Sequence, residues 1–276
     1  MDVPRVVDLR AWAGDRRRAR LRVGQGAPPS REGVRFAMRV SLFVTCLGDR
    51  FFAEAAADAV RLLRSLDVDV DVPDQQTCCG QPAWNAGHAD LARRMAEHTA
   101  RVLEDDRPVV LVSGSCTAML RHAYPRLGIG GTEGKGLPGR SYELAEFIVG
   151  VLGVTKLGRG LEGRTFAYHH GCHALRELRA GDAPVALLRG AGARVAEWEA
   201  DEECCGFGGL FSVKVAPVSV AMADRKLDTL PPAEALVSGD PGCLLHLGGR
   251  ALRRGMGIPV RPLASILWEA RDHGRR

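Results

Sequence analysis

Two short stretches of the sequence, TCCGQP at residues 77–82 and ECCGFG at residues 203–208, carry the same Cys-Cys-Gly motif. They lie 126 residues apart, and the remaining cysteines keep nearly the same spacing. The eight cysteines therefore form two sets of four with none left over: Cys46, Cys78, Cys79 and Cys116, then Cys172, Cys204, Cys205 and Cys243. This register indicates an internal duplication in which each copy carries a four-thiol site.

Short apolar segments alternate with helical patterns in both copies. The predicted strands are residues 39–45, 68–72, 108–112, 164–168, 193–198 and 235–238. The predicted helices are residues 51–66, 88–104, 174–189, 217–229, 243–253 and 263–271. Such alternation is typical of parallel sheets covered by helices. The sequence therefore predicts an α/β fold of two tandem Rossmann-like repeats, residues 38–155 and 156–276.

The cysteines stand where a parallel sheet places its ligands. One cysteine of each set follows the first predicted strand of its repeat, and another follows the third. Open parallel sheets bind ligands beyond the carboxyl ends of their strands. A glycine follows each cysteine pair, at Gly80 and Gly206. It allows a tight chain reversal, and its N–H group can donate to a sulfur. We therefore expect the four thiols of each repeat to converge.

The charge of the chain is concentrated at one end. Residues 1–37 contain nine arginines and four acids, which accounts for the whole net charge of +5. We interpret them as a disordered Arg-rich extension, or as sequence preceding a true start at Met38. The neutral remainder gives no reason to expect nucleic-acid binding. Residues 128–140 contain six glycines and predict a mobile loop in the first repeat.

The composition points to a cytoplasmic protein. The sequence contains no run of 18 apolar residues, so we expect no membrane span. Residues 1–37 lack the apolar core of a secretory signal. In a reducing compartment, cysteines in this pattern indicate ligands or redox thiols rather than disulfides.

Four thiolates in each repeat match the ligand demand of a 4Fe-4S cluster, so one or two clusters are predicted. Zinc is the alternative, because four sulfurs also suit a tetrahedral zinc ion. Zinc sites usually gather their ligands in close C-x₂₋₄-C pairs, and this sequence has none. Thiol–disulfide chemistry without a metal is a third interpretation.

Three histidines are candidates for supplementary ligands or for hydrogen bonds that tune the metal. His169 and His173 lie close to Cys172 in the sequence, and His246 follows Cys243 by about one helical turn. The simpler interpretation is that these histidines shape a turn or pack a helix. Lys226, Asp228 and the acidic residues 199–203 are expected to be solvated surface.

Several longer stretches carry a resemblance to a known family. They are SLFVTCLGD (41–49), QQTCCGQPAWNAG (75–87), SGSCTAM (113–119), YHHGCHALR (168–176), CCGFGG (204–209) and DPGCLLHLGG (240–249). Over residues 38–271 the chain resembles the cysteine-rich CCG-repeat family, which includes the CCG-containing subunit of heterodisulfide reductase and the iron–sulfur subunit of glycolate oxidase. That family's fuller pattern ends each repeat with Cys-x-x-Cys, but Met119 and His246 occupy the last position here. This departure puts a five-cysteine noncubane cluster in doubt.

The resemblance implies an iron–sulfur protein of an L-lactate oxidation system that relays electrons to a downstream acceptor. It implies other iron–sulfur subunits as partners, and we identify no catalytic residues for hydride removal in this chain. The alternatives are a thiol/disulfide reductase subunit of the heterodisulfide reductase type and a zinc-stabilised scaffold without a redox role.

Overall fold

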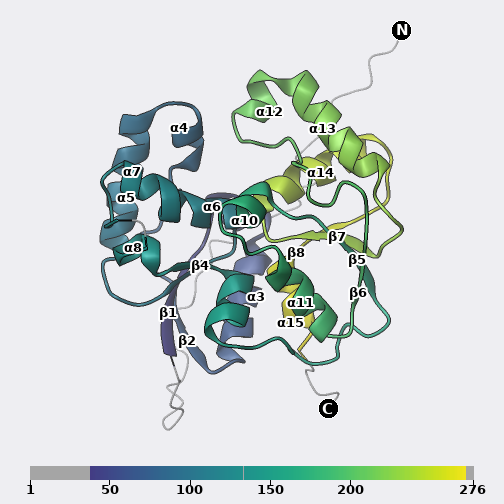
Figure 1. Cartoon of the computed structure of the whole chain (residues 1–276), viewed down its shortest axis with the longest axis horizontal. Helices are drawn as coiled ribbons and strands as arrows, with labels where there is room; N and C mark the ends of the chain where they lie inside the picture. The colour runs from purple at the N-terminus through teal and green to yellow at the C-terminus, as the bar shows by residue number, and fades with distance from the viewer. Residues whose placement is uncertain (1–37, 133, 272–276) are drawn as a thin grey trace, which may run out of the picture. The chain divides into compact units, whose positions relative to one another are not determined.

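The computed structural model describes residues 38–132 and 134–271 and confirms the predicted α/β fold (Figure 1). The interpretations of residues 1–37 lie outside the described residues. Two four-stranded sheets are present, with strand orders β2-β1-β3-β4 and β6-β5-β7-β8. Every pair of neighbouring strands is parallel. The two sheets therefore have the same topology, as expected for two tandem repeats.

Each sheet is built on short strands that are apolar at the centre and polar at the edge. The first comprises β1 (Met38–Phe43), β2 (Val68–Asp71), β3 (Val109–Leu111) and β4 (Ser141–Glu143). The second comprises β5 (Thr165–Tyr168), β6 (Arg194–Ala196), β7 (Ala235–Ser238) and β8 (Val260–Pro262). All three residues of β3 and all four of β7 are buried, as central parallel strands require.

Helices cover the sheets and fill the connections between strands. In the first repeat they are α2 (Cys46–Phe51), α3 (Ala53–Arg64), α4 (Gln81–Asn85), α5 (Ala89–Val102), α6 (Gly114–Ala118), the π-helix η1 (Met119–Ala123), α7 (Tyr124–Arg126), α8 (Gly136–Gly139), α9 (Leu144–Glu146) and the π-helix η2 (Phe147–Val151). In the second they are α10 (Cys172–Arg176), α11 (Asp182–Gly190), α12 (Phe211–Lys214), α13 (Ala216–Asp228), α14 (Pro241–Arg253) and α15 (Leu263–Glu269).

The predicted helix at residues 174–189 is wrong, because two helices occupy this region. Helix α10 ends at Arg176, and Arg179 has a φ of 55°, which interrupts helical geometry. Helix α11 then begins at Asp182 and places Pro184 in its first turn. Proline is tolerated at that position but not in a helix interior. The position of Pro184 was thus a signal for the break.

Two edge strands and several short helices, α8 among them, were not predicted. Strand β4 has the polar sequence SYE, although Ser141 and Glu143 are buried. Strand β8 ends at Pro262, as suits an edge strand. The segment 128–140, expected to be a loop throughout, contains α8, whose Leu137 and Pro138 are buried. At least this part of the segment packs against the fold.

The two repeats share a central hydrophobic core, and each also has a smaller apolar cluster of its own. A single cluster of buried side chains draws from both sheets and from α3, η2, α11 and α15. Across the boundary, α3 packs on α15 and α9 packs on α11, while α2 contacts α14 and α6 contacts α10. Helices α3, α9, α2 and α6 of the first repeat correspond to α11, α15, α10 and α14 of the second. Each contact between the repeats therefore has a counterpart in which the two repeats exchange roles. The repeats are therefore related by an approximate twofold arrangement.

No helix among the described residues is long and apolar enough to cross a membrane.

Because the core is shared, a cavity on one side should destabilise both repeats together. Leu62 in α3 is fully buried in this core. We expect Leu62→Ala to lower the free energy of unfolding by about 2–5 kcal/mol in urea denaturation. The matched variant Leu91→Ala, at a position 43% exposed, should have a far smaller effect. Two separate unfolding transitions for the wild-type protein would contradict the shared core.

Candidate metal centre

All eight cysteines line one cavity, whose volume is about 210 Å³. It lies beyond the carboxyl ends of the central strands, because β1, β3, β5 and β7 each lead into a cysteine-bearing helix. The twofold arrangement turns the cysteine-bearing ends of the two repeats toward each other. The sequence predicted two convergent sets of thiols, but not that both would face the same space.

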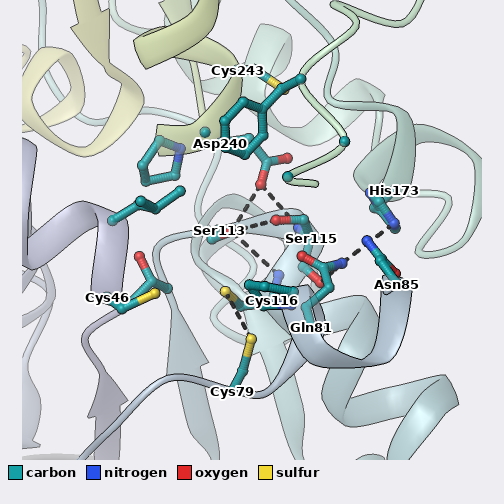
Figure 2. A pocket seen from close by; sticks show the side chains of 18 of the residues that line it. Cys46, Cys79, Gln81, Asn85, Ser113, Ser115, Cys116, His173, Asp240 and Cys243 are labelled. Carbon is teal, nitrogen blue, oxygen red and sulfur yellow. Dashed lines mark hydrogen bonds between the residues drawn. The ribbon is translucent and has the colours of Figure 1, made fainter. Parts of the chain in front are cut away.

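The first set is gathered by a helix start, a turn and a second helix. Cys46 is the first residue of α2, whose preceding residue Thr45 accepts a hydrogen bond from the N–H of Gly48. Cys46 is exposed, whereas Cys79 and Cys116 are buried with their sulfurs 3.4 Å apart (Figure 2). The first site therefore has one exposed cysteine and a buried inner end.

The turn after each cysteine pair has the conformation expected from its glycine. Gly80 has a φ of 91° and Gly206 a φ of 86°. The N–H of Gly206 donates to the sulfur of Cys204 at 3.4 Å, and the N–H of Phe207 donates to Cys205 at the same distance. The predicted reversal and the predicted N–H to sulfur bonds are thus present in the second repeat.

In each set one thiol is acidified by its neighbours. Hydrogen bonds from the thiols of Cys46 and Cys79 lower the pKa of Cys78 to about 3. Hydrogen bonds from Cys172 and Cys205 likewise lower the pKa of Cys204 to about 2. These sulfurs are close enough to share protons, and a thiophilic metal bound there would replace those protons.

The thiols that donate these hydrogen bonds have raised pKa values. The hydrogen bond to Cys78 raises the pKa of Cys46, and the hydrogen bond to Cys204 raises that of Cys172. The innermost thiols also have raised pKa values. The largest cause for Cys79 is its hydrogen bond to Cys116, and the largest cause for Cys205 is its hydrogen bond to Cys204. The four sulfurs of each set therefore form one connected group.

His169 is the histidine that the structure places deepest in the second site. Its side chain is fully buried, and no hydrogen bond of normal geometry reaches either ring nitrogen. A ring nitrogen lies within 4.8 Å of the sulfurs of Cys205 and Cys243. Burial lowers the pKa of His169 to about 3, so the ring is neutral and can act as a metal ligand. An unpaired buried imidazole beside two thiols is a donor set that suits a metal.

The other two histidines have different surroundings. His173 lines the cavity, with Nδ1 3.6 Å from the sulfur of Cys172 and Nε2 3.4 Å from Nε2 of Gln81. His246 is not among the residues that line the cavity, and its Nε2 lies 3.2 Å from Oγ of Ser219. This geometry favours a packing role for His246.

Asp240 joins the two repeats at the cavity wall, a role that the sequence analysis missed. Its Oδ1 accepts hydrogen bonds from Oγ of Ser113 at 2.8 Å and from the N–H of Ser115 at 3.0 Å (Figure 2). Ser113 and Asp240 both stand three residues before a cysteine and both precede a helix. Asp240 makes no side-chain cap on its own helix and binds the start of α6 in the other repeat instead. The equivalent positions of Ser113 and Asp240 in the two repeats were the sequence signal for this contact.

The space around Asp240 is kept by glycines. A Cβ at Gly171 would lie 2.2 Å from Oδ2 of Asp240, and a Cβ at Gly114 would lie 2.6 Å from Cβ of Ala174. Gly114 therefore allows the two repeats to approach closely at Ala174, while Gly171 leaves room for the carboxylate of Asp240 within the second repeat.

A buried carboxyl group lies behind Asp240. Glu143 caps α9 and accepts hydrogen bonds from the N–H groups of Ala145 and Glu146. Its burial raises its pKa to about 8, and the nearby charge of Asp240 adds to this. Glu143 is therefore largely protonated at neutral pH.

The prediction that Lys226 is solvated surface is wrong. Lys226 has no exposed surface, and its Nζ donates to the carbonyl oxygens of Ala200, Asp201 and Glu203. It lies on the face of α13 that carries the buried residues Ala223 and Leu227, which was the overlooked signal. By contrast, Asp228, Glu199 and Glu202 are exposed as expected, whereas Asp201 and Glu203 are half-buried.

Comparison with known proteins gives a family match in each repeat. The family described as "CCG: Cysteine-rich domain" matches residues 40–121 and 166–248. The relatives found include several named lactate utilization protein A. That of Geobacillus kaustophilus is 44% identical over 83% of this chain and 98% of its own length. That of Geobacillus sp. strain WCH70 is 41% identical over 83% of this chain and 99% of its own length, and that of Oceanobacillus iheyensis is 40% identical over 86% and 99%.

Solved structures show only a remote likeness. A solute-binding protein of an ABC transporter from Agrobacterium vitis aligns at 14% identity with a TM-score of 0.28, covering 82% of this chain and 75% of its own.

The turn after the second cysteine pair should not tolerate a side chain. A Cβ at Gly206 would lie 2.6 Å from the carbonyl oxygen of Ser219, whereas a Cβ at Gly87, which has a similar φ of 81°, would meet nothing within 4 Å. At Gly87→Ala, where only the positive φ is unfavourable, we expect a loss of about 1 kcal/mol in the free energy of unfolding. Gly206→Ala should cost more, because the new side chain also meets the backbone of Ser219. Urea denaturation of both variants measures the difference, and equal losses would refute the close approach.

Glu143 should make the free energy of unfolding depend on pH between 4.5, the ordinary pKa of a glutamate, and about 8. The folded state keeps a proton that the unfolded state releases above pH 4.5, so stability is lost as pH rises toward about 8. The variant Glu143→Gln should lack this loss, which amounts to at most about 1.4 kcal/mol per pH unit. Unfolding free energies from pH 5 to 9 provide the measurement. Parallel curves for the variant and the wild type would show that Glu143 is ionised when folded.

Proposed function

We propose, since this chain belongs to the CCG cysteine-rich domain family, that it is an iron–sulfur protein of an L-lactate utilization system. In this role it relays electrons from L-lactate oxidation to a downstream acceptor. The observation that carries the proposal is the convergence of two sets of four thiols on one cavity. The names of the relatives support the involvement of lactate.

Each set of thiols has the donors that a cubane cluster requires. Cys46, Cys78, Cys79 and Cys116 would hold one cluster, and Cys172, Cys204, Cys205 and Cys243 would hold the other. A bound 4Fe-4S cluster supplies a one-electron couple. His169 is proposed as a supplementary ligand or hydrogen-bond partner of the second cluster, with His173 beside it at the cavity wall.

The chain's own contribution is to hold the sulfurs and to exclude water. Cys79, Cys116, Cys205 and Cys243 are buried, which lowers the local dielectric around the inner sulfurs. The N–H groups of Gly206 and Phe207 point at sulfur and stabilise negative charge there. The exposed Cys46 gives the first site an edge at the surface, where a redox partner can approach.

Electron relay needs no acid, base or nucleophile in this chain. We therefore assign the oxidation of lactate itself to partner subunits, which are proposed to be the other iron–sulfur subunits of the system. The proposed location is the cytoplasm, where thiolate ligands stay reduced.

A second candidate function is thiol or disulfide reduction. The sulfurs of Cys79 and Cys116 lie 3.4 Å apart, and the acidified Cys78 is a suitable thiolate nucleophile. A zinc-stabilised scaffold is the third candidate, because either set could also hold zinc.

Anaerobic purification followed by metal and acid-labile sulfide analysis separates the candidates. We expect about four irons and four sulfides for each occupied site. Zinc without sulfide would instead indicate the scaffold. Metal-free protein that reduces a disulfide substrate would indicate the reductase and overturn the relay.

Two matched cysteine variants test the assignment of ligands. Cys79→Ser should deplete iron from the first site and leave the second, and Cys205→Ser should do the reverse, because each removes a buried thiolate from one set. Iron content and the electron paramagnetic resonance spectrum of the reduced protein provide the readout. Loss of all iron from either variant, with the fold intact by circular dichroism, would contradict independent sites.

A further inference from the structure

The two cysteine sites differ in one buried charge. The contacts of Gly80 and Gly206 show which residues of α5 and α13 occupy equivalent positions. A Cβ at Gly80 would contact the carbonyl oxygen of Ala92 and Cβ of Met95, and a Cβ at Gly206 would contact the same atoms of Ser219 and Met222. Helices α5 and α13 therefore match with an offset of 127 residues. In this register Lys226 corresponds to Thr99.

Both residues of this pair are buried, but only one is charged. Thr99 is 2% exposed and Lys226 is 0% exposed. The Nζ of Lys226 donates to the carbonyl oxygen of Glu203 at 2.8 Å, directly before Cys204, and lies 4.7 Å from the centre of the Trp198 ring. Trp198 belongs to the same apolar cluster as Cys205 and Cys243. The ammonium group is thus packed beneath the second cysteine site.

Lys226 remains charged at neutral pH. Burial lowers its pKa to about 8, while the nearby Cys205, Glu203 and Asp201 oppose this change. The surrounding acids are less buried: Glu199 and Glu203 pair with Arg225 at the surface. Asp240 raises the pKa of Cys172 in the second set, and its carboxylate is hydrogen-bonded to Ser113 and Ser115 beside Cys116 of the first set, so it bears on both sites. The second site also has the buried His169, but that ring is neutral. The cation of Lys226 is therefore a buried charge that the first site lacks at the equivalent position.

We propose that the buried ammonium group of Lys226 makes the second cysteine site the electron-accepting member of the pair. The proposal rests on the proposed iron–sulfur function. A positive charge in a region of low dielectric stabilises the more negative, reduced state of a nearby centre. Thr99 gives the first site no such stabilisation.

The direction of transfer follows from this difference. With a cluster held by each set of cysteines, one electron would pass from the first to the second, so the first would be oxidised and the second reduced by one electron. No bond breaks and no proton moves. The exposed Cys46 places the donating site where an external one-electron carrier can reduce it again.

Single-site proteins allow the potentials to be compared. Reconstituted Cys79→Ser retains the second site, and Cys205→Ser retains the first. We expect the midpoint potential of the second site to exceed that of the first in redox titrations followed by electron paramagnetic resonance. An equal or lower potential for the second site would overturn the proposal.

The charge itself is tested at position 226. In the Cys79→Ser protein, Lys226→Met should shift the ratio of oxidised to reduced centre at least tenfold, which is about 59 mV for one electron. Lys226→Arg should retain most of the wild-type potential. In the Cys205→Ser protein, the matched control Thr99→Met should leave the potential of the first site unchanged.

The outcomes distinguish this proposal from the function on which it rests. Wild-type protein that binds no iron and sulfide would overturn both. Clusters in both sites with a potential unaffected by Lys226→Met would overturn only the role of Lys226. If Lys226→Met fails to fold, the comparison of the two single-site proteins still decides the order of potentials.

Discussion

The hydrogen bonds from Ser113 and Ser115 to Asp240 are the contact on which the arrangement of the site depends. They tie the start of one cysteine-bearing helix to the start of its counterpart in the other repeat. A buried carboxylate without these donors would be costly, so the two helix starts are held together. Gly114 makes the approach of the repeats possible, and Gly171 leaves room for the Asp240 carboxylate. As a result, two separate sets of thiols open onto one cavity.

Much of the fold followed from the spacing of cysteines and apolar segments. The duplication, the parallel sheets and the convergence of four thiols in each repeat were all predictable, because strand ends and glycine turns are local features. Strands β4 and β8 were missed because three residues give too little periodicity, and the polar SYE sequence of β4 does not look buried. Contacts between repeats, such as Asp240 with Ser113, depend on tertiary packing that no local pattern encodes.

Lys226 shows the same limit at a single residue. A lysine near the end of a helix is normally solvated, and its charge argued for the surface. The three carbonyl oxygens that bind its Nζ come from residues 200–203, which lie more than twenty positions away. Those acceptors offset the cost of burial and fix the loop that leads into Cys204. The apolar neighbours of Lys226 on α13 indicated its direction, but not its partners.

The pairing of Ser113 with Asp240 also bears on why both halves belong to one polypeptide. In a symmetric dimer of identical single-repeat chains, these two positions would carry the same residue. Two aspartates would then face each other and repel, and two serines would lack the carboxylate that binds the neighbouring N–H. A fused chain lets the positions diverge. Covalent linkage thus permits an unequal, complementary contact on the symmetry axis, which a homodimer could not encode.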